Sequence, residues 1–223
     1  MNILRITGSL GAEITDINLG SDLGDDTITK IRSALLEHCV LFFHNQEFDD
    51  EAHKRLARRF GEIFIHPFFV AGDDPEIVII HRKPEDASIV GFEWHSDTAM
   101  AAEPPMGSIL YALRAPPVGG DTLFANQYLA YERLSDGMKT MLDGLRAVHS
   151  DRRVAGPNSG RNVGRSTKAR DDSTWRETVN LHPVVRTHPE TCRKSLFVDH
   201  SYTVGFENMT EDESQPLLIP RVA

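Results

Sequence analysis

Cysteine is scarce in this sequence, which holds only Cys39 and Cys192 among its 223 residues. Two cysteines are too few for a disulfide framework, and they lack the close spacing of a cysteine metal site. The sequence also lacks an apolar run long enough to cross a bilayer, and its first 14 residues show no basic-then-apolar secretion signal. We therefore expect a soluble cytoplasmic protein with no membrane partner.

Runs of basic residues are absent as well. The 24 lysines and arginines stand against 33 acidic residues, which gives a formal net charge of −9. Because binding to a phosphate backbone requires clustered positive charge, we do not expect a nucleic-acid partner. No linker rich in Pro, Gly or Ser divides the chain, and 223 residues can bury a substantial core. The sequence therefore predicts a single domain over residues 1–223.

Several segments show the patterns of helices. Apolar residues recur on one face after Asp25 and again between Phe48 and Phe60. Residues 126–145 are also helical in pattern, with a hinge near Asp136 and Gly137. Near the end of the chain, Thr210 to Glu213 forms a capping box that opens a helix.

Short apolar runs predict more strands than helices. They are too short for buried helices and lie at residues 3–6, 12–17, 39–43, 75–80, 108–112, 123–125, 182–186 and 195–198. Many strands with few, mostly early helices favour an α+β class, a β-rich jelly roll with flanking helices. Residues 151–177 are polar and lack periodicity, so we expect a mobile loop or lid there.

The most informative stretch is Trp94-His95-Ser96-Asp97. On an extended strand, residues two apart point to the same side, so His95 and Asp97 can hold one metal ion. They supply two thirds of the 2-His-1-carboxylate triad, which leaves open positions on Fe(II). The apolar residues that flank the pair can line a pocket.

A second His-x-Asp tripeptide, His149-Ser150-Asp151, has the same spacing, so only context can distinguish the two. It runs directly into Arg152 and Arg153, where a metal cation meets like charge. We interpret it as the end of a strand that carries a surface histidine. For His66, a histidine satisfied by backbone at the edge of a loop is the alternative to a binding role. Thr122 similarly has the alternative of an ordinary strand start.

Several ordered motifs resemble the Fe(II)- and 2-oxoglutarate-dependent taurine dioxygenase family, which includes herbicide and alkylsulfate dioxygenases. The resemblance runs from about Leu4 to Leu218. It is carried by Gly61-Glu62 with Ile65-His66-Pro67, by Trp94 to Asp97, by Gly119 to Leu123, by Tyr131 to Leu134 and by His182 to Thr191. It implies the double-stranded β-helix form of the jelly roll, similar to that of clavaminate synthase.

The resemblance implies roles for individual residues. His95 and Asp97 match the first two iron ligands, and Thr122 matches the residue whose hydroxyl helps to bind 2-oxoglutarate. His66 matches a residue that hydrogen-bonds the acidic group of sulfonate substrates, and it can donate from both nitrogens when charged. Phe69 stands where the taurine enzyme has a tyrosine that contacts the sulfonate. Taurine itself is therefore a less natural substrate than a larger or less polar acid.

In the family, the third ligand, a histidine, and an arginine that clamps 2-oxoglutarate follow the helix that starts here at Thr210. After Leu218 this sequence does not resemble the family's continuation, so we expect a chain that is incomplete at its C-terminus and lacks the last strands and the third ligand. His182, His188 and His200 favour hydrogen-bonding roles over metal binding, and we do not assign Arg186 to the clamp. Cys192 stands where the family usually turns on glycine.

The implied cofactors are Fe(II), 2-oxoglutarate as co-substrate and O2. The implied reaction hydroxylates a small acidic substrate of the sulfonate, sulfate ester or aryloxy acid type, with release of succinate and CO2. We also expect a homo-oligomer, either a dimer or a tetramer. Two alternatives stay open, which are a catalytically inactive truncated member of the family and a jelly-roll protein that binds a small molecule.

Overall fold

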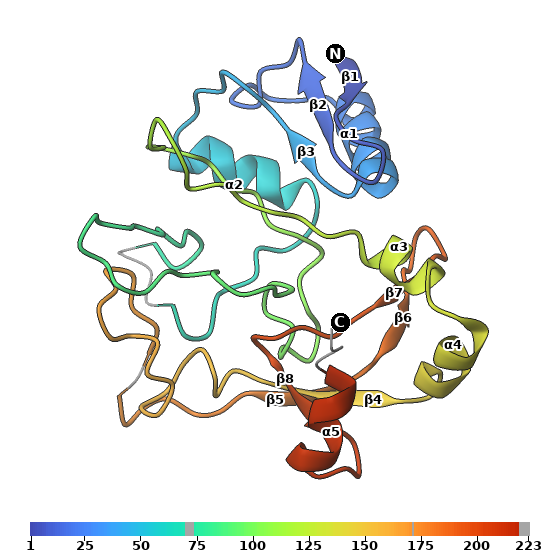
Figure 1. Cartoon of the computed structure of the whole chain (residues 1–223). Helices are drawn as coiled ribbons and strands as arrows, with labels where there is room; N and C mark the ends of the chain where they lie inside the picture. Colours follow the sequence, from blue (N-terminus) through green and yellow to red (C-terminus); the bar gives the residue numbers. More distant parts are fainter. Residues whose placement is uncertain (70–73, 171, 219–223) are drawn as a thin grey trace. The chain divides into compact units, whose positions relative to one another are not determined.

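A computed structural model describes residues 1–69, 74–170 and 172–218 (Figure 1). The chain divides into two compact units, and each is built from three stretches of sequence. The first unit comprises residues 1–63, 108–133 and 187–195, and the second comprises residues 64–107, 134–186 and 196 onward. The structure mixes helices and sheets, as the sequence predicts. The organisation as one domain stays a prediction.

The first unit begins with a small sheet. Strands β1 (Asn2–Arg5) and β2 (Ala12–Thr15) pair antiparallel, and β2 pairs parallel with β3 (Leu41–Phe42). Three helices complete the unit: α1 (Asp25–His38), α2 (Asp50–Arg58) and α3 (Gln127–Glu132). The inward residues of α1 and α2 form one hydrophobic cluster, which contains Leu19, Ile28, Ile31 and Leu56. The early helices and the first two strands that the sequence predicts are therefore confirmed.

The second unit is organised around an antiparallel sheet in the order β5-β4-β8. Its elements are α4 (Asp136–Leu142), β4 (Arg146–Ser150), β5 (Val179–Pro183), β8 (Thr203–Phe206) and α5 (Glu211–Leu218). Helix α5 packs on β8, where the Phe206 amide donates to Ser214 Oγ at 3.0 Å (Figure 1). Two further short strands, β6 (Val185–Thr187) and β7 (Lys194–Leu196), pair with each other.

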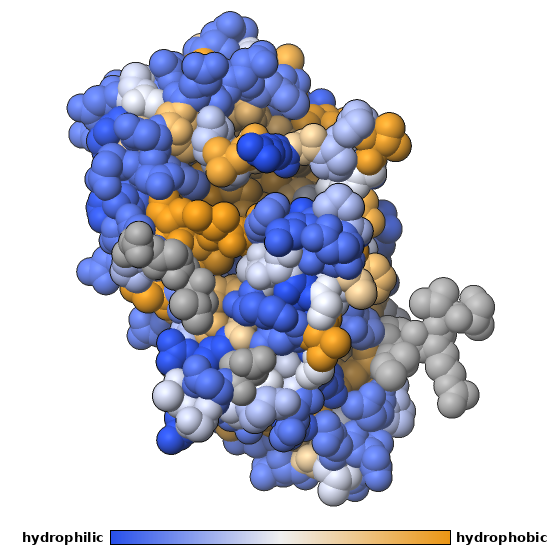
Figure 2. Space-filling model, turned by 90° about the vertical axis from the view of Figure 1, so that its left-hand side faces the viewer, coloured by the Kyte–Doolittle hydropathy of each residue, from blue (hydrophilic) through white to orange (hydrophobic). Residues whose placement is uncertain are grey.

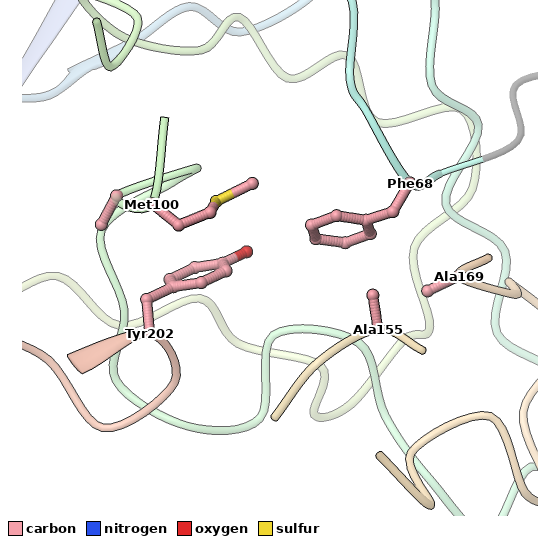
Figure 3. Close-up of a cluster of buried hydrophobic side chains, with 6 residues drawn as sticks. Phe68, Met100, Ala155, Ala169 and Tyr202 are labelled. Atoms are coloured by element: carbon pink, nitrogen blue, oxygen red, sulfur yellow. The ribbon is translucent and has the colours of Figure 1, made fainter. Parts of the chain in front are cut away.

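The main hydrophobic core of the second unit lies outside its helices and, for the most part, outside its strands. Figure 3 shows the side chains of Phe68, Met100 and Tyr202 pointing toward one another, with Ala155 and Ala169 nearby. The two alanines belong to the polar stretch 151–177, which contains no helix or named strand among its described residues. This stretch therefore contributes to the core, and its role as a lid stays a prediction.

Three apolar segments predicted as core strands are irregular instead. Residues 75–80, 108–112 and 123–125 form no strand in the structure. Several of their apolar side chains are exposed, with Leu110 at 73% and Leu123 at 72%, while others such as Ile109 are partly buried. A strand requires a neighbour that satisfies its backbone groups, and these segments have no such partner among the described residues. Figure 2 shows hydrophobic residues at the surface between hydrophilic ones. No helix in the described part of the chain is long and apolar enough to cross a membrane.

The capping box at the start of α5 is present as the sequence predicts. The Thr210 amide donates to Glu213 Oε2 at 2.8 Å, and the Glu213 amide donates to Thr210 Oγ1 at 3.3 Å. These reciprocal bonds satisfy two backbone groups that the helix itself cannot satisfy. The box matters for the unit because Pro216 weakens the same helix from within.

We expect Thr210→Ala to lower the free energy of unfolding by about 1 kcal/mol, since a capping hydroxyl typically contributes that much. Thr210→Ser keeps the hydroxyl and should stay close to the wild type. Urea unfolding followed by circular dichroism measures both variants. Equal midpoints for the alanine and serine variants would show that the box does not stabilise α5.

Candidate metal centre

His95 and Asp97 lie in an irregular loop rather than in the strand that the sequence predicts. Residues 94–96 form neither helix nor strand, and a turn covers residues 97–100, with Thr98 at a φ of 48°. Within the turn, Ala99 and Met100 are fully buried in the hydrophobic core. This core therefore anchors the C-terminal side of the loop, and the loop stands at the edge of the second unit's core.

The side chains of His95 and Asp97 nevertheless face each other. His95 Nε2 lies 3.2 Å from Asp97 Oδ1, and His95 Nδ1 lies 2.7 Å from the Glu93 carbonyl oxygen. Because a carbonyl oxygen only accepts, Nδ1 must carry the proton that forms this second bond. In the neutral ring, Nε2 therefore presents its lone pair on the same side as the carboxylate. This is the arrangement in which a histidine and an aspartate bind one metal ion.

Charge around the pair favours the protonated ring when no metal is present. The hydrogen bond to Asp97 raises the pKa of His95, against the opposing effect of burial. A second carboxylate, Asp199, accepts from the Ser96 amide at 3.4 Å and from the Tyr202 amide at 2.7 Å. Burial raises the pKa of Asp199. The charges of Asp97 and Asp199 both raise the pKa of His95, so the surroundings of the ring favour a cation.

His66 lies in the same unit and is electrostatically coupled to Asp97. Its Nδ1 accepts from the backbone amides of Phe68 at 3.4 Å and Phe69 at 3.2 Å. Burial lowers the pKa of His66 to about 4, so the ring is neutral at pH 7. Two donating nitrogens require the charged ring, whereas here Nδ1 accepts from backbone, and the predicted role of His66 in substrate binding stays a prediction. Only Nε2–H is left to donate to a ligand.

The other predicted contacts of the substrate and co-substrate belong to different units. Phe69 is partly buried, and its ring lies 4.7 Å from that of His66, so these two predicted substrate residues lie together. Thr122 belongs to the first unit and is exposed in an irregular segment. Its predicted role in binding 2-oxoglutarate stays a prediction.

The second His-x-Asp tripeptide lies at the C-terminal end of β4, as predicted, but its histidine is not at the surface. His149 is fully buried, and its ring packs 5.1 Å from Phe197 and 5.5 Å from His182. Burial lowers the pKa of His149 to about 4. Asp151 is buried too and accepts from the Thr178 amide at 3.1 Å. The arginines that follow favoured a surface position for this histidine, whereas the strand turns its side chain into the core.

The side chains of His182 and His188 have hydrogen-bonding partners. His182 Nε2 lies 2.8 Å from the Ala101 carbonyl oxygen, so β5 holds the backbone that follows the metal loop. Nδ1 of His188 accepts from the amides of Glu190 and Thr191. These contacts agree with the hydrogen-bonding roles that the sequence favours for both residues.

The donors at His95 and Asp97 fit Fe(II), which binds imidazole nitrogen and carboxylate oxygen in facial triads. Across residues 1–69, 74–170 and 172–218, no group of three or more His, Cys, Asp or Glu side chains is arranged to hold a metal ion. The described residues therefore provide a two-ligand site.

Three residues that support the loop were not predicted from the sequence. Glu93 orients the ring of His95, Arg161 pairs with the Glu93 carboxylate, and Asp199 caps the Ser96 amide. Arg161 and Asp199 are far from the loop in sequence, and no spacing rule connects them to it. Only Glu93 carries a local signal, since it lies two residues before His95.

The comparison of sequences agrees with the geometry. Residues 2–218 match the family described as "Taurine catabolism dioxygenase TauD, TfdA family". An alkylsulfatase of Acinetobacter baylyi is 34% identical over 221 residues, which cover 97% of this chain and 68% of that protein. An alpha-ketoglutarate-dependent sulfonate dioxygenase of Saccharomyces cerevisiae is 31% identical over 232 residues, which cover 98% of this chain and 54% of that protein. The chain thus spans about half to two thirds of the length of these relatives.

The comparison of structures gives the same result. The crystal structure of a taurine dioxygenase from Burkholderia xenovorans superposes with a TM-score of 0.75 at 32% sequence identity. The match covers 97% of this chain and 69% of that chain.

Removing the charge of Asp97 should lower the pKa of both neighbouring imidazoles. Asp97 raises the pKa of His95 mainly by a hydrogen bond, and its charge also raises the pKa of His66. NMR titration of the metal-free Asp97→Asn variant should therefore show both rings losing their protons at lower pH than in the wild type. Asp212→Asn, an exposed change on α5, is the matched control. An unshifted His95 would contradict the contact.

Acid should destabilise the second unit through His149. This ring is neutral in the fold, with a pKa of about 4 against an ordinary value of 6.5. Stability is fully present above pH 6.5 and falls as the pH drops toward 4, because the unfolded chain takes up the proton first. His149→Gln should weaken this pH dependence by up to about 1.4 kcal/mol per pH unit. Denaturant unfolding at several pH values measures the slope, and exposed His44→Gln should leave it unchanged.

Proposed function

The chain belongs to the TauD/TfdA family of taurine catabolism dioxygenases, and from this premise we propose that it is an Fe(II)- and 2-oxoglutarate-dependent dioxygenase. The observation that carries the proposal is the approach of His95 Nε2 to Asp97 Oδ1 at 3.2 Å. A ring whose other nitrogen is already bonded to a carbonyl has one lone pair left, and that lone pair faces the carboxylate.

His95 and Asp97 are the two residues that would hold the iron. When bound with 2-oxoglutarate and O2, Fe(II) supplies the oxidising chemistry that yields succinate, CO2 and a hydroxylated product. The protein residues orient the donors and exclude water. The buried residues Ala99 and Met100 keep the loop attached to a dry core, which favours a fixed geometry of the two ligands.

The proposed substrate is a small organic acid of the sulfonate, sulfate ester or aryloxy acid type. His66 supports this class because its free Nε2–H can donate one hydrogen bond to an anionic oxygen, while its Nδ1 is held by backbone. Phe69 presents an apolar ring beside His66 where a hydroxyl would favour a more polar substrate. Relatives that act on sulfonates and sulfate esters agree with this class.

The proposal also covers the fold, the role of Thr122, the oligomeric state and the location of the protein in the cell. We propose that the sheets of this chain belong to the family's jelly roll, that Thr122 contributes to binding 2-oxoglutarate, and that the protein works as a homo-oligomer in the cytoplasm. The inactive family member and the simple binding protein are the outcomes that a failed test would favour.

Anaerobic titration with Fe(II) and 2-oxoglutarate tests the proposal directly. The wild type should develop the weak visible charge-transfer band of an iron-bound 2-oxoglutarate. His95→Ala and Asp97→Ala should lose the band and weaken iron binding by at least about tenfold, since each removes a direct ligand. His44→Ala, which changes an exposed histidine of the first unit, should keep it.

Turnover provides the second measurement. With O2 present, succinate should form in amounts that depend on an added sulfonate, sulfate ester or aryloxy acid. A wild type that shows neither the band nor succinate with any of the three classes would contradict the proposed activity. If the band forms but no succinate does, the protein binds iron and 2-oxoglutarate and its substrate lies outside the three classes.

A further inference from the structure

The orientation of His95 depends on Glu93. The Glu93 carbonyl accepts from His95 Nδ1 at 2.7 Å, which fixes the ring rotation and leaves Nε2 toward Asp97. A metal-binding histidine needs such a partner for its second nitrogen. Because residues 93–96 form neither helix nor strand, no ladder of backbone bonds fixes this carbonyl. Its position must come from the contacts of the loop.

One of these contacts is a single side chain from a distant segment. Arg161 Nη2 lies 2.5 Å from Glu93 Oε2, and the two side chains are 27% and 42% exposed. The arginine end is itself fixed, since Ser88 Oγ donates to the Arg161 carbonyl at 3.2 Å and the Ala87 amide donates to the Gly164 carbonyl at 2.7 Å. Arg161 is thus attached to the second unit through more than its own ion pair.

Two further contacts of the loop involve its backbone and come from the segment at residues 199–200. The His200 amide donates to the Trp94 carbonyl at 3.2 Å, and Asp199 accepts from the Ser96 amide at 3.4 Å. These two bonds hold residues 94 and 96. The ion pair with Arg161 holds the Glu93 side chain, and this contact restrains the residue whose carbonyl accepts from His95.

We propose that Arg161 is a positioning residue for the metal ligand His95, acting through Glu93. This inference rests on the proposed function, since it assigns Arg161 to the metal site of that function. A partly exposed ion pair adds little to the stability of a fold. Its effect here is on the direction of one imidazole, so metal affinity should change while unfolding barely does.

Mn(II) affinity, measured by electron paramagnetic resonance of the free ion, tests the proposal without any turnover. Arg161→Met should weaken Mn(II) binding about tenfold, as loss of a supporting contact does at other metal sites. Arg161→Lys keeps the charge and should recover most of the affinity. The matched control is Arg152→Met, which removes a similar exposed ion pair, to Glu211 at 2.7 Å, that does not touch the loop.

Affinity within about twofold of the wild type in Arg161→Met, or an equal loss in Arg152→Met, would overturn the proposal. If Arg161→Met does not fold, Glu93→Gln decides in its place, because it keeps the carbonyl and removes the charge that Arg161 binds. A tenfold loss in Glu93→Gln supports the proposal, and unchanged affinity overturns it.

A measurement on the metal-free protein separates this proposal from the proposed function. If the wild type binds no Mn(II), the proposed function fails, and the backbone order parameters of residues 93–97 then test the positioning role. They should fall from the rigid value of about 0.85 toward about 0.6 in Arg161→Met and stay unchanged in Arg152→Met. Unchanged order parameters in Arg161→Met would overturn the positioning role.

Discussion

The approach of His95 to Asp97 depends on contacts made outside the loop that carries both residues. Asn180 and His182 of β5 bond the carbonyls of Met100 and Ala101, which fixes the chain after the pair. The 199–200 segment bonds the Trp94 carbonyl, just before the pair, and the Ser96 amide, between its two residues. The sheet therefore does not present the ligands itself; β5 and the 199–200 segment together hold an irregular segment whose backbone follows no regular ladder.

This arrangement also sets the protonation of the site. Without metal, the hydrogen bond to the Asp97 carboxylate raises the pKa of His95, which favours a proton on the ring. A metal ion that binds both must displace that proton, so metal binding and pH are linked. The charge of Asp97 also acts on His66, but this ring stays neutral because burial lowers its pKa. The loop thus combines a position that prefers a cation with a neighbour that donates a single hydrogen bond.

The helices could be predicted from local sequence signals. The strands were harder to predict because each strand depends on a neighbouring strand that its own sequence does not specify. The cap at Thr210 and the apolar face of α1 are encoded by residues close together in sequence, and both occur in the structure. Residues 108–112 have the composition of a core strand, but composition does not supply the neighbour with which a strand pairs. Likewise, Cys192 adopts a φ of 58°, the left-handed conformation that its glycine-like position suggests. The residues that support the site, such as Arg161, lie too far along the chain for any local pattern.

The two His-x-Asp tripeptides show why spacing alone cannot identify a metal site. In His149-Ser150-Asp151 the spacing coincides with β4, yet the histidine packs against Phe197 and the aspartate accepts a backbone amide. The histidine packs among aromatic rings while the aspartate is bonded to the chain before β5, so the two side chains have different neighbours. In His95-Ser96-Asp97 no strand is present, and the donors converge because one ring nitrogen is held by the Glu93 carbonyl. The two donors therefore face each other because of the hydrogen bond at Nδ1 of the histidine. That hydrogen bond indicates a metal-binding pair better than the spacing of the two ligands in the sequence does.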